Sequence, residues 1–88
     1  MDDIAGIVRA YILDTFLPGV GAAELADTEP LIRGGVIDSI AIIRLVSFLE
    51  ERFGIAIAPH EAGVDYLDTI EQITTLVRGK MDAGGRPA

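Results

Sequence analysis

A serine beside an aspartate is the strongest candidate for chemistry in this 88-residue chain. Asp38 and Ser39 come directly before the most apolar segment, and the pair Gly34-Gly35 precedes them. Glycines allow a sharp turn, and aspartate is a preferred helix N-cap because its carboxylate accepts hydrogen bonds from free first-turn amides. Ser39 would then lie in the first turn, where free amides and the helix dipole favour negative charge. The pattern is therefore favourable for a phosphate attached to the Ser39 hydroxyl.

Other catalytic chemistry has little basis in the sequence. A serine nucleophile needs a base within hydrogen-bond reach, and the only histidine, His60, is expected in a surface turn with no motif that ties it to Ser39. Without cysteine there is no disulfide or thiolate, and one histidine gives no basis for a zinc site. The glycine pair lacks the lysine and the spacing of a P-loop. We therefore expect no catalytic residues and no metal ligands, and any thiol must come from a cofactor.

The serine motif and the segments after it resemble acyl carrier and peptidyl carrier proteins. The matching residues are Gly35-x-x-Asp38-Ser39-Ile40, the helix end Phe48-Leu49-Glu50-Glu51-Arg52-Phe53-Gly54-Ile55, Ile55-x-Ile57 and Asp68-Thr69-Ile70, so the resemblance covers roughly residues 4 to 78. In that family the serine of Asp-Ser-Leu, here Asp-Ser-Ile, carries a covalent 4′-phosphopantetheine from coenzyme A, whose thiol holds a cargo as a thioester. The resemblance implies this attachment at Ser39. It also implies that a phosphopantetheinyl transferase recognises Asp38 near a magnesium ion.

The resemblance implies a fold and a set of partners. The fold is an all-α four-helix bundle with a long loop between helices one and two and a short third helix. The partners are a phosphopantetheinyl transferase, an acyl- or aminoacyl-loading enzyme, and a downstream acyltransferase or synthase. The protein itself would be a carrier and not an enzyme. An aminoacyl or peptidyl carrier of a nonribosomal peptide pathway remains an alternative, as does an unmodified helical interaction module.

One departure from the family bears on the pathway. Fatty-acid carriers typically follow the serine with acidic residues on the exposed face of the second helix, whereas this stretch has Ala41 and Arg44, with acids only at Glu50 and Glu51. A basic patch on an enzyme of fatty acid biosynthesis would find less to bind. The departure favours a specialised carrier of a secondary-metabolite pathway, such as polyketide or nonribosomal peptide biosynthesis.

Composition indicates one small domain. Half of the residues are apolar, which is enough for a single core. Seven basic and fourteen acidic residues give a net charge of −7, which repels phosphate backbones and anionic lipid headgroups. The start Met1-Asp2-Asp3 does not resemble a signal peptide, and no apolar run approaches the ~20 residues needed to cross a bilayer. We expect a cytoplasmic monomer that binds neither nucleic acid nor membrane.

The first helix is predicted over residues 2 to 17, with Asp2 and Asp3 at the positive end of its dipole. Its apolar positions at helical spacing are Ile4, Ile7, Val8, Tyr11, Ile12 and Phe16. Pro18 and the glycines that follow end this helix. The stretch from there to about residue 37 is predicted to be a long ordered loop, because isolated apolar residues can pin it to the core. These residues are Leu25, Leu31, Ile32, Val36 and Ile37.

The second helix is predicted from Ser39 to about Phe53, and its faces separate at 100° per residue. The inward face holds Ile42, Leu45, Val46, Leu49 and Phe53. Ile40 and Ile43 fall on the outward face and would form a small exposed apolar patch beside Ser39, unless the preceding loop covers them. Carrier proteins present the matching positions to their enzymes. The resemblance therefore implies partner binding by Ile40, Ile43, Arg44, Ser47, Glu50 and Glu51.

The last third of the chain is predicted to complete the bundle. Gly54 should end the second helix, Ile55 and Ile57 should point inward from an extended connector, and residues 60–67 should hold a short third helix that Gly63 weakens. A cap at position 68 or 69, with a glutamate or glutamine three residues later, begins helix four. Its inward stripe is Ile70, Ile73, Leu76, Val77 and Met81.

Two further predictions concern packing and chain limits. Helices two and four should pack through Leu45, Val46, Leu49, Ile73 and Val77, while helix one closes the bundle through Ile7, Tyr11 and Phe16. The carrier domain should span residues 1–81, and residues 82–88 should form a flexible C-terminal tail because they are polar and rich in helix breakers. The chain limits just outside helices one and four are those expected of a free-standing carrier.

Overall fold

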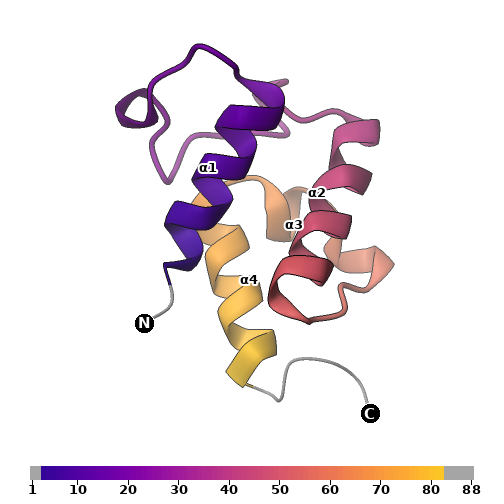
Figure 1. Ribbon diagram of the computed structural model, residues 1–88. Helices are drawn as coiled ribbons and strands as arrows, with labels where there is room; N and C mark the ends of the chain where they lie inside the picture. The colour runs from indigo at the N-terminus through magenta and orange to yellow at the C-terminus, as the bar shows by residue number, and fades with distance from the viewer. Residues whose placement is uncertain (1–2, 83–88) are drawn as a thin grey trace.

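The computed structural model describes residues 3–82, and this part of the chain is entirely helical and loop. Its helices are α1 (Ile4–Phe16), α2 (Ser39–Phe53), α3 (Val64–Leu67) and α4 (Ile70–Asp82), with 3₁₀ turns at Ala22–Glu24 and Pro59–Glu61. In Figure 1, α1 runs opposite to α2 and α4. The predicted all-α class, the long loop before α2 and the short third helix are confirmed.

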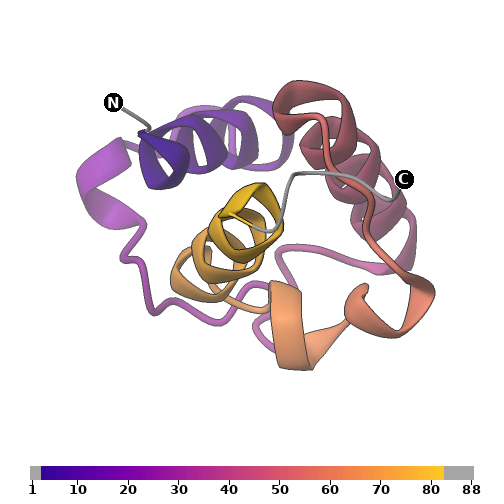
Figure 2. The same cartoon turned by 90° about the horizontal axis from the view of Figure 1, so that it is seen from below.

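The core forms around α4. Figure 2, seen along the helices, shows α4 between α1 and α3, with α2 across from it and the long loop passing round the outside. Each helix and the long loop contribute side chains that are less than 2% exposed: Ile4, Val8, Ile12, Leu31, Ile37, Leu45, Leu49, Leu67, Ile70, Ile73 and Val77. Ile55 and Ile57 are buried as predicted, whereas Leu76 and Met81 are only partly buried at the edge.

The first helix packs through most of its predicted apolar positions, and Tyr11 and Phe16 are partly buried against the core as predicted. Its buried residues are Ile4, Val8 and Ile12, which lie one turn apart on a single stripe. Ile7 lies outside the core cluster and lines a groove between α1 and α2, so the prediction that it closes the bundle is wrong. Tyr11 is half-buried and contacts α2, as described below.

The helix ends follow local capping rules. Asp3 caps α1 by accepting a hydrogen bond from the Gly6 N–H, and Gly54 ends α2 in the left-handed conformation. The predicted short helix over residues 60–67 is restricted to Val64–Leu67, and Gly63, which was expected to weaken it, lies at the N-cap position just before it. Two positions were open for the cap of α4, and the structure assigns it to Thr69. The Thr69 Oγ1 accepts from the Gln72 N–H at 3.0 Å, and the Gln72 Oε1 accepts from the Thr69 N–H at 3.2 Å.

Asp68, the other position considered for that cap, has a different role. Its side chain is fully buried, and its Oδ1 accepts hydrogen bonds from the N–H groups of Ile32 (2.8 Å) and Arg33 (3.0 Å) in the long loop. The Arg33 Nε donates to Oδ2 at 2.6 Å. The Asp68 carbonyl also accepts from the Leu31 N–H at 2.6 Å. Asp68, which lies between α3 and α4, therefore binds three successive loop residues.

These contacts set the ionisation of Asp68. Burial by itself raises the pKa of this carboxyl, because a charge is less stable away from water. The hydrogen bonds from the Arg33 and Ile32 amides and from the Arg33 guanidinium act in the opposite direction and outweigh burial. The pKa of Asp68 therefore lies below its usual value of 3.8.

The division of the chain into a carrier domain over residues 1–81 and a C-terminal tail remains a prediction. Asp82 is the last residue of α4, so the helix includes the first residue of the predicted tail. The remainder of that tail, residues 83–88, and Asp2 in the predicted first helix lie outside the described residues.

Replacing Leu49 by alanine is expected to lower the free energy of unfolding by ~2–5 kcal/mol, because Leu49 is completely buried and the truncation leaves a cavity. Ile43→Ala is the matched control, since Ile43 is 66% exposed on the same helix and should lose less than ~0.5 kcal/mol. Denaturant titration of both variants measures the difference. A loss below about 1 kcal/mol for Leu49→Ala would place Leu49 outside the core.

Asp68 should make stability fall in acid. Because its pKa is lower in the folded state than its usual 3.8, its contribution is complete above that value and is lost as the pH falls through the lower folded-state pKa. The free energy of unfolding of the Asp68→Asn variant should therefore approach that of the unchanged protein between about pH 6 and about pH 2. Denaturant titrations over this range provide the measurement, and two parallel curves would contradict the assignment.

Candidate functional site

The site is the start of α2. Asp38 is the N-cap, and its Oδ1 accepts a hydrogen bond from the Ala41 N–H at 2.8 Å, which confirms the predicted cap. Ser39 is the first helical residue and is exposed. Within the described residues, the Ser39 and Ile40 amides have no backbone acceptor. The Ser39 hydroxyl thus lies in solvent beside two free N–H groups and the positive end of the helix dipole.

The two glycines before the site have separate structural reasons. Gly35 has φ +82°, a left-handed conformation that other residues rarely adopt. At Gly34, a Cβ atom would collide with the Pro30 carbonyl oxygen. The turn that contains both glycines is closed by hydrogen bonds from the Val36 and Ile37 amides to the Leu31 carbonyl, at 2.9 and 3.0 Å. This turn brings the chain to Asp38.

The outward face of α2 carries the predicted apolar patch. Ile40 is 67% exposed and Ile43 is 66% exposed, so the preceding loop does not cover them. Arg44, Ser47 and Glu51 are exposed on the same helix. The structure thus places these five residues in solvent along the helix that begins with Ser39.

Two other residues of α2 lie differently from the sequence prediction. Ala41, which we counted with Arg44 on the exposed face, is only 7% exposed, because it lies one turn before Leu45 on the buried stripe. Glu50 is half-buried, and its carboxylate accepts a hydrogen bond from the Ile57 N–H at 2.8 Å. Glu50 thus stabilises the connector after α2, and its availability to a partner is reduced.

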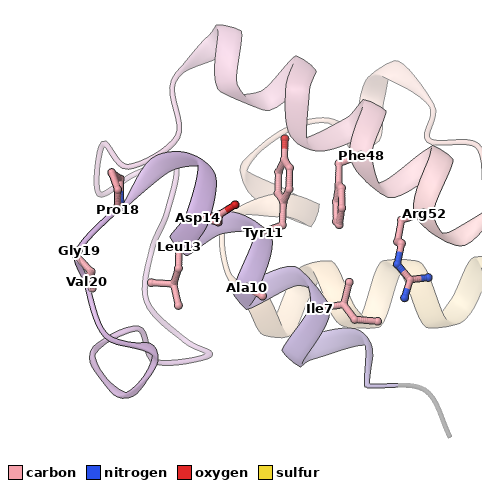
Figure 3. Close-up of a pocket in the computed structure, with 10 residues that line it drawn as sticks. All are labelled: Ile7, Ala10, Tyr11, Leu13, Asp14, Pro18, Gly19, Val20, Phe48 and Arg52. Atoms are coloured by element: carbon pink, nitrogen blue, oxygen red, sulfur yellow. The ribbon is translucent and has the colours of Figure 1, made fainter.

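A groove of about 810 Å³ separates α1 from α2 (Figure 3). At its centre the Tyr11 ring stacks on Phe48, with centroids 3.9 Å apart and ring planes 9° apart. The Tyr11 hydroxyl donates a hydrogen bond to the Arg44 carbonyl at 3.3 Å. Arg52 and Ile7 lie near one end of the groove, and Pro18 and Val20 lie near the other. Ser39 does not line it, so the groove is separate from the proposed attachment point.

Within residues 3–82, no arrangement of side chains supports a serine hydrolase or a metal site. The His60 ring lies edge-on to Tyr66, with centroids 6.3 Å apart, and no hydrogen bond joins His60 to Ser39. Over the same residues, no group of three or more histidine, cysteine or acidic side chains could hold a metal ion. In the same part of the chain, no helix has the length and apolar character needed to cross a membrane.

Sequence reasoning missed the contact between Asp68 and Arg33. A recognisable signal was present, because Asp68 lies between Leu67 and Ile70, two core residues, and Thr69 with Gln72 is sufficient to cap α4. An aspartate that is not needed as a cap in such a place must find other donors. The location of those donors, 35 residues earlier in the chain, could not be read from any local pattern.

Comparisons with known proteins agree with this geometry. The family model described as phosphopantetheine attachment site matches residues 17–77, which include the long loop, α2, α3 and part of α4. The solved structure of apo KstB-PCP, a peptidyl carrier protein, is 28% identical to this chain and superposes with a TM-score of 0.68. That alignment covers 96% of this chain and 89% of the other. A comparison with curated proteins gives no match.

The family match covers more than half of the chain and contains Asp38 and Ser39. The helical fold and the similar peptidyl carrier structure agree with it over nearly the whole chain. The chain therefore belongs to the phosphopantetheine attachment site family, which comprises the acyl and peptidyl carrier proteins.

Proposed function

We propose that this protein is a carrier in which the Ser39 hydroxyl is esterified with 4′-phosphopantetheine from coenzyme A. The observation that carries the proposal is the exposure of Ser39 at the first position of a capped helix, inside the region that matches the phosphopantetheine attachment family. The exposed hydroxyl is accessible to a modifying enzyme without any rearrangement of the core. When attached, the group supplies a thiol that can hold an acyl or aminoacyl cargo as a thioester.

The donors at the site fit a phosphate group. The free Ser39 and Ile40 amides and the dipole of α2 stabilise negative charge next to the hydroxyl. One Asp38 oxygen is used in the Ala41 hydrogen bond, and the carboxylate remains exposed at the surface. Asp38 can therefore cap the helix and still contact a phosphopantetheinyl transferase.

The protein has no need of catalytic residues in this role. Its residues hold the attachment point in place, and other enzymes load the cargo and remove it. We propose that these enzymes bind the exposed face of α2 through Ile40, Ile43, Arg44, Ser47 and Glu51. Glu50 can contribute to partner binding only through the carboxylate oxygen that does not accept from the Ile57 N–H. On this proposal the carrier acts as a cytoplasmic monomer.

The identity of the exposed residues favours a specialised pathway over fatty acid synthesis. Because Ala41 is buried, the comparison depends on Arg44. Fatty-acid carriers typically have acidic residues on this exposed face, whereas Arg44 is positively charged. A secondary-metabolite acyl carrier and an aminoacyl or peptidyl carrier both remain compatible with Arg44. The similarity to KstB-PCP supports the peptidyl alternative.

The attachment site can be tested by mass. The unchanged protein, incubated with coenzyme A and a broad-specificity phosphopantetheinyl transferase, should gain one phosphopantetheine in its intact mass. Ser39→Ala should fold normally and gain none, whereas Ser47→Ala, the matched control on the same helix, should be modified. No gain in the unchanged protein would favour the unmodified interaction module, and modification of Ser39→Ala would exclude Ser39 as the sole site.

The partner face can be tested by reversing the charge of Arg44. Arg44→Glu should slow loading by the enzyme of the protein's own pathway and speed loading by a fatty-acid synthase transferase, because a basic docking surface then finds an acid. Both effects should weaken as salt is added, since exposed charges are screened. Ile43→Ala should slow both reactions without unfolding the protein, because buried apolar contacts often dominate binding at an interface centre. Loading rates that stay unchanged in both variants would place recognition elsewhere.

A further inference from the structure

A continuous set of hydrogen bonds leads from Asp68 to the residue before the Ser39 motif. The Asp68 side chain and carbonyl bind the amides of Leu31, Ile32 and Arg33. The Leu31 carbonyl accepts from the Val36 and Ile37 amides, and Ile37 directly precedes Asp38. The path therefore crosses the glycine turn and ends at the N-cap of α2.

Apolar packing alone does not determine this turn. The apolar residues at its two ends are buried or partly buried against the core, but Arg33, Gly34 and Gly35 at its middle are exposed. A glycine pair has wide conformational freedom, so some other contact must select one conformation. The buried carboxylate supplies that contact, because it accepts from two successive amides and from the guanidinium of the same loop.

We infer that Asp68 is a positioning residue for the modification of Ser39: its buried carboxylate holds residues 31–37 in the single conformation that presents Asp38 and Ser39 to the transferase. The inference rests on the proposed function. Arg33 assists by donating its Nε–H to the carboxylate, while 68% of its side chain remains exposed to solvent. Asp68 itself contacts neither Ser39 nor any reacting atom and acts through the loop.

Partial loss of the native loop conformation affects the kinetics of modification in a way that a loss of stability does not. If the loop adopts its native conformation for only a fraction of the time, the apparent affinity of the transferase for the carrier falls by that fraction. A fraction of about one tenth raises the KM for the carrier about tenfold. The kcat at saturating carrier stays unchanged, because the bound complex has the native loop. A merely structural role, in a variant that remains fully folded, alters neither constant.

The test uses three full-length variants with coenzyme A and a broad-specificity phosphopantetheinyl transferase. In Asp68→Asn the amide oxygen can still accept from the loop amides, but the amide nitrogen cannot accept from Arg33. Arg33→Ala removes only the guanidinium and leaves the backbone contacts. Glu61→Gln is the matched control: Glu61 also pairs with a cation, Lys80, at 2.8 Å and accepts from the Ala58 N–H, but it has no contact with the long loop.

Circular dichroism first establishes that each variant is folded at the assay temperature, and intact mass then gives the rate of modification against carrier concentration. We expect KM to rise about tenfold for Asp68→Asn and less for Arg33→Ala, with kcat unchanged and Glu61→Gln equal to the unchanged protein. Amide hydrogen exchange of Val36 and Ile37 should be faster in the first two variants only.

The possible results separate the inference from the proposed function. If the unchanged protein gains no phosphopantetheine, the proposed function fails. If it is modified but Asp68→Asn and Glu61→Gln have the same KM, the positioning role is wrong and the proposed function stands. Should Asp68→Asn fail to fold, Arg33→Ala decides, because it alters an exposed side chain, and an unchanged KM in that variant overturns the inference.

Discussion

The burial of one carboxylate constrains the long loop that leads to the start of α2. A charge away from water is costly unless it is fully paired, and Asp68 meets this condition only when the long loop supplies two amides and a guanidinium. The loop is also attached to the same end of α4 by the Glu71 amide, which donates to the Asp27 carbonyl at 3.0 Å. The start of α4 and the residues just before it thus hold the loop together with its buried apolar residues and with Arg9 of α1, which contacts Leu25 and Asp27.

Much of the fold could be predicted because it depends on short-range patterns. The 3.6-residue period identified α1, α2 and α4 within about two residues at each end, and capping chemistry at Asp3, Asp38 and Gly54 explains where those helices begin and end. The packing of α1 was less predictable. Several of its apolar residues lie at helical spacing, and only the position of α4 decides that Ile4, Val8 and Ile12 are buried while Ile7 faces a groove.

In the candidate site, too, some features follow from local sequence patterns and others depend on contacts between distant residues. The cap at Asp38, the exposure of Ser39 and the exposed pair Ile40 and Ile43 all follow from a helix that starts at a known residue and buries one face. The hydrogen bond from the Ile57 amide to Glu50 and the contact between Asp68 and Arg33 join residues that are distant in sequence. The spacing of apolar residues cannot predict such long-range hydrogen bonds, because it indicates only which side of one helix faces the core.

The stacked rings at the centre of the α1–α2 groove also give this protein an internal spectroscopic reporter. The chain has no tryptophan and two tyrosines, and Tyr11 lies face to face with Phe48 while its hydroxyl reaches the Arg44 carbonyl. Across the described residues no Cα atom of α1 comes within 8 Å of one in α2, so the aromatic side chains bridge the gap between the helices. The ring protons of Tyr11 experience the ring current of Phe48, and their chemical shifts therefore measure the spacing of α1 and α2 without any added label.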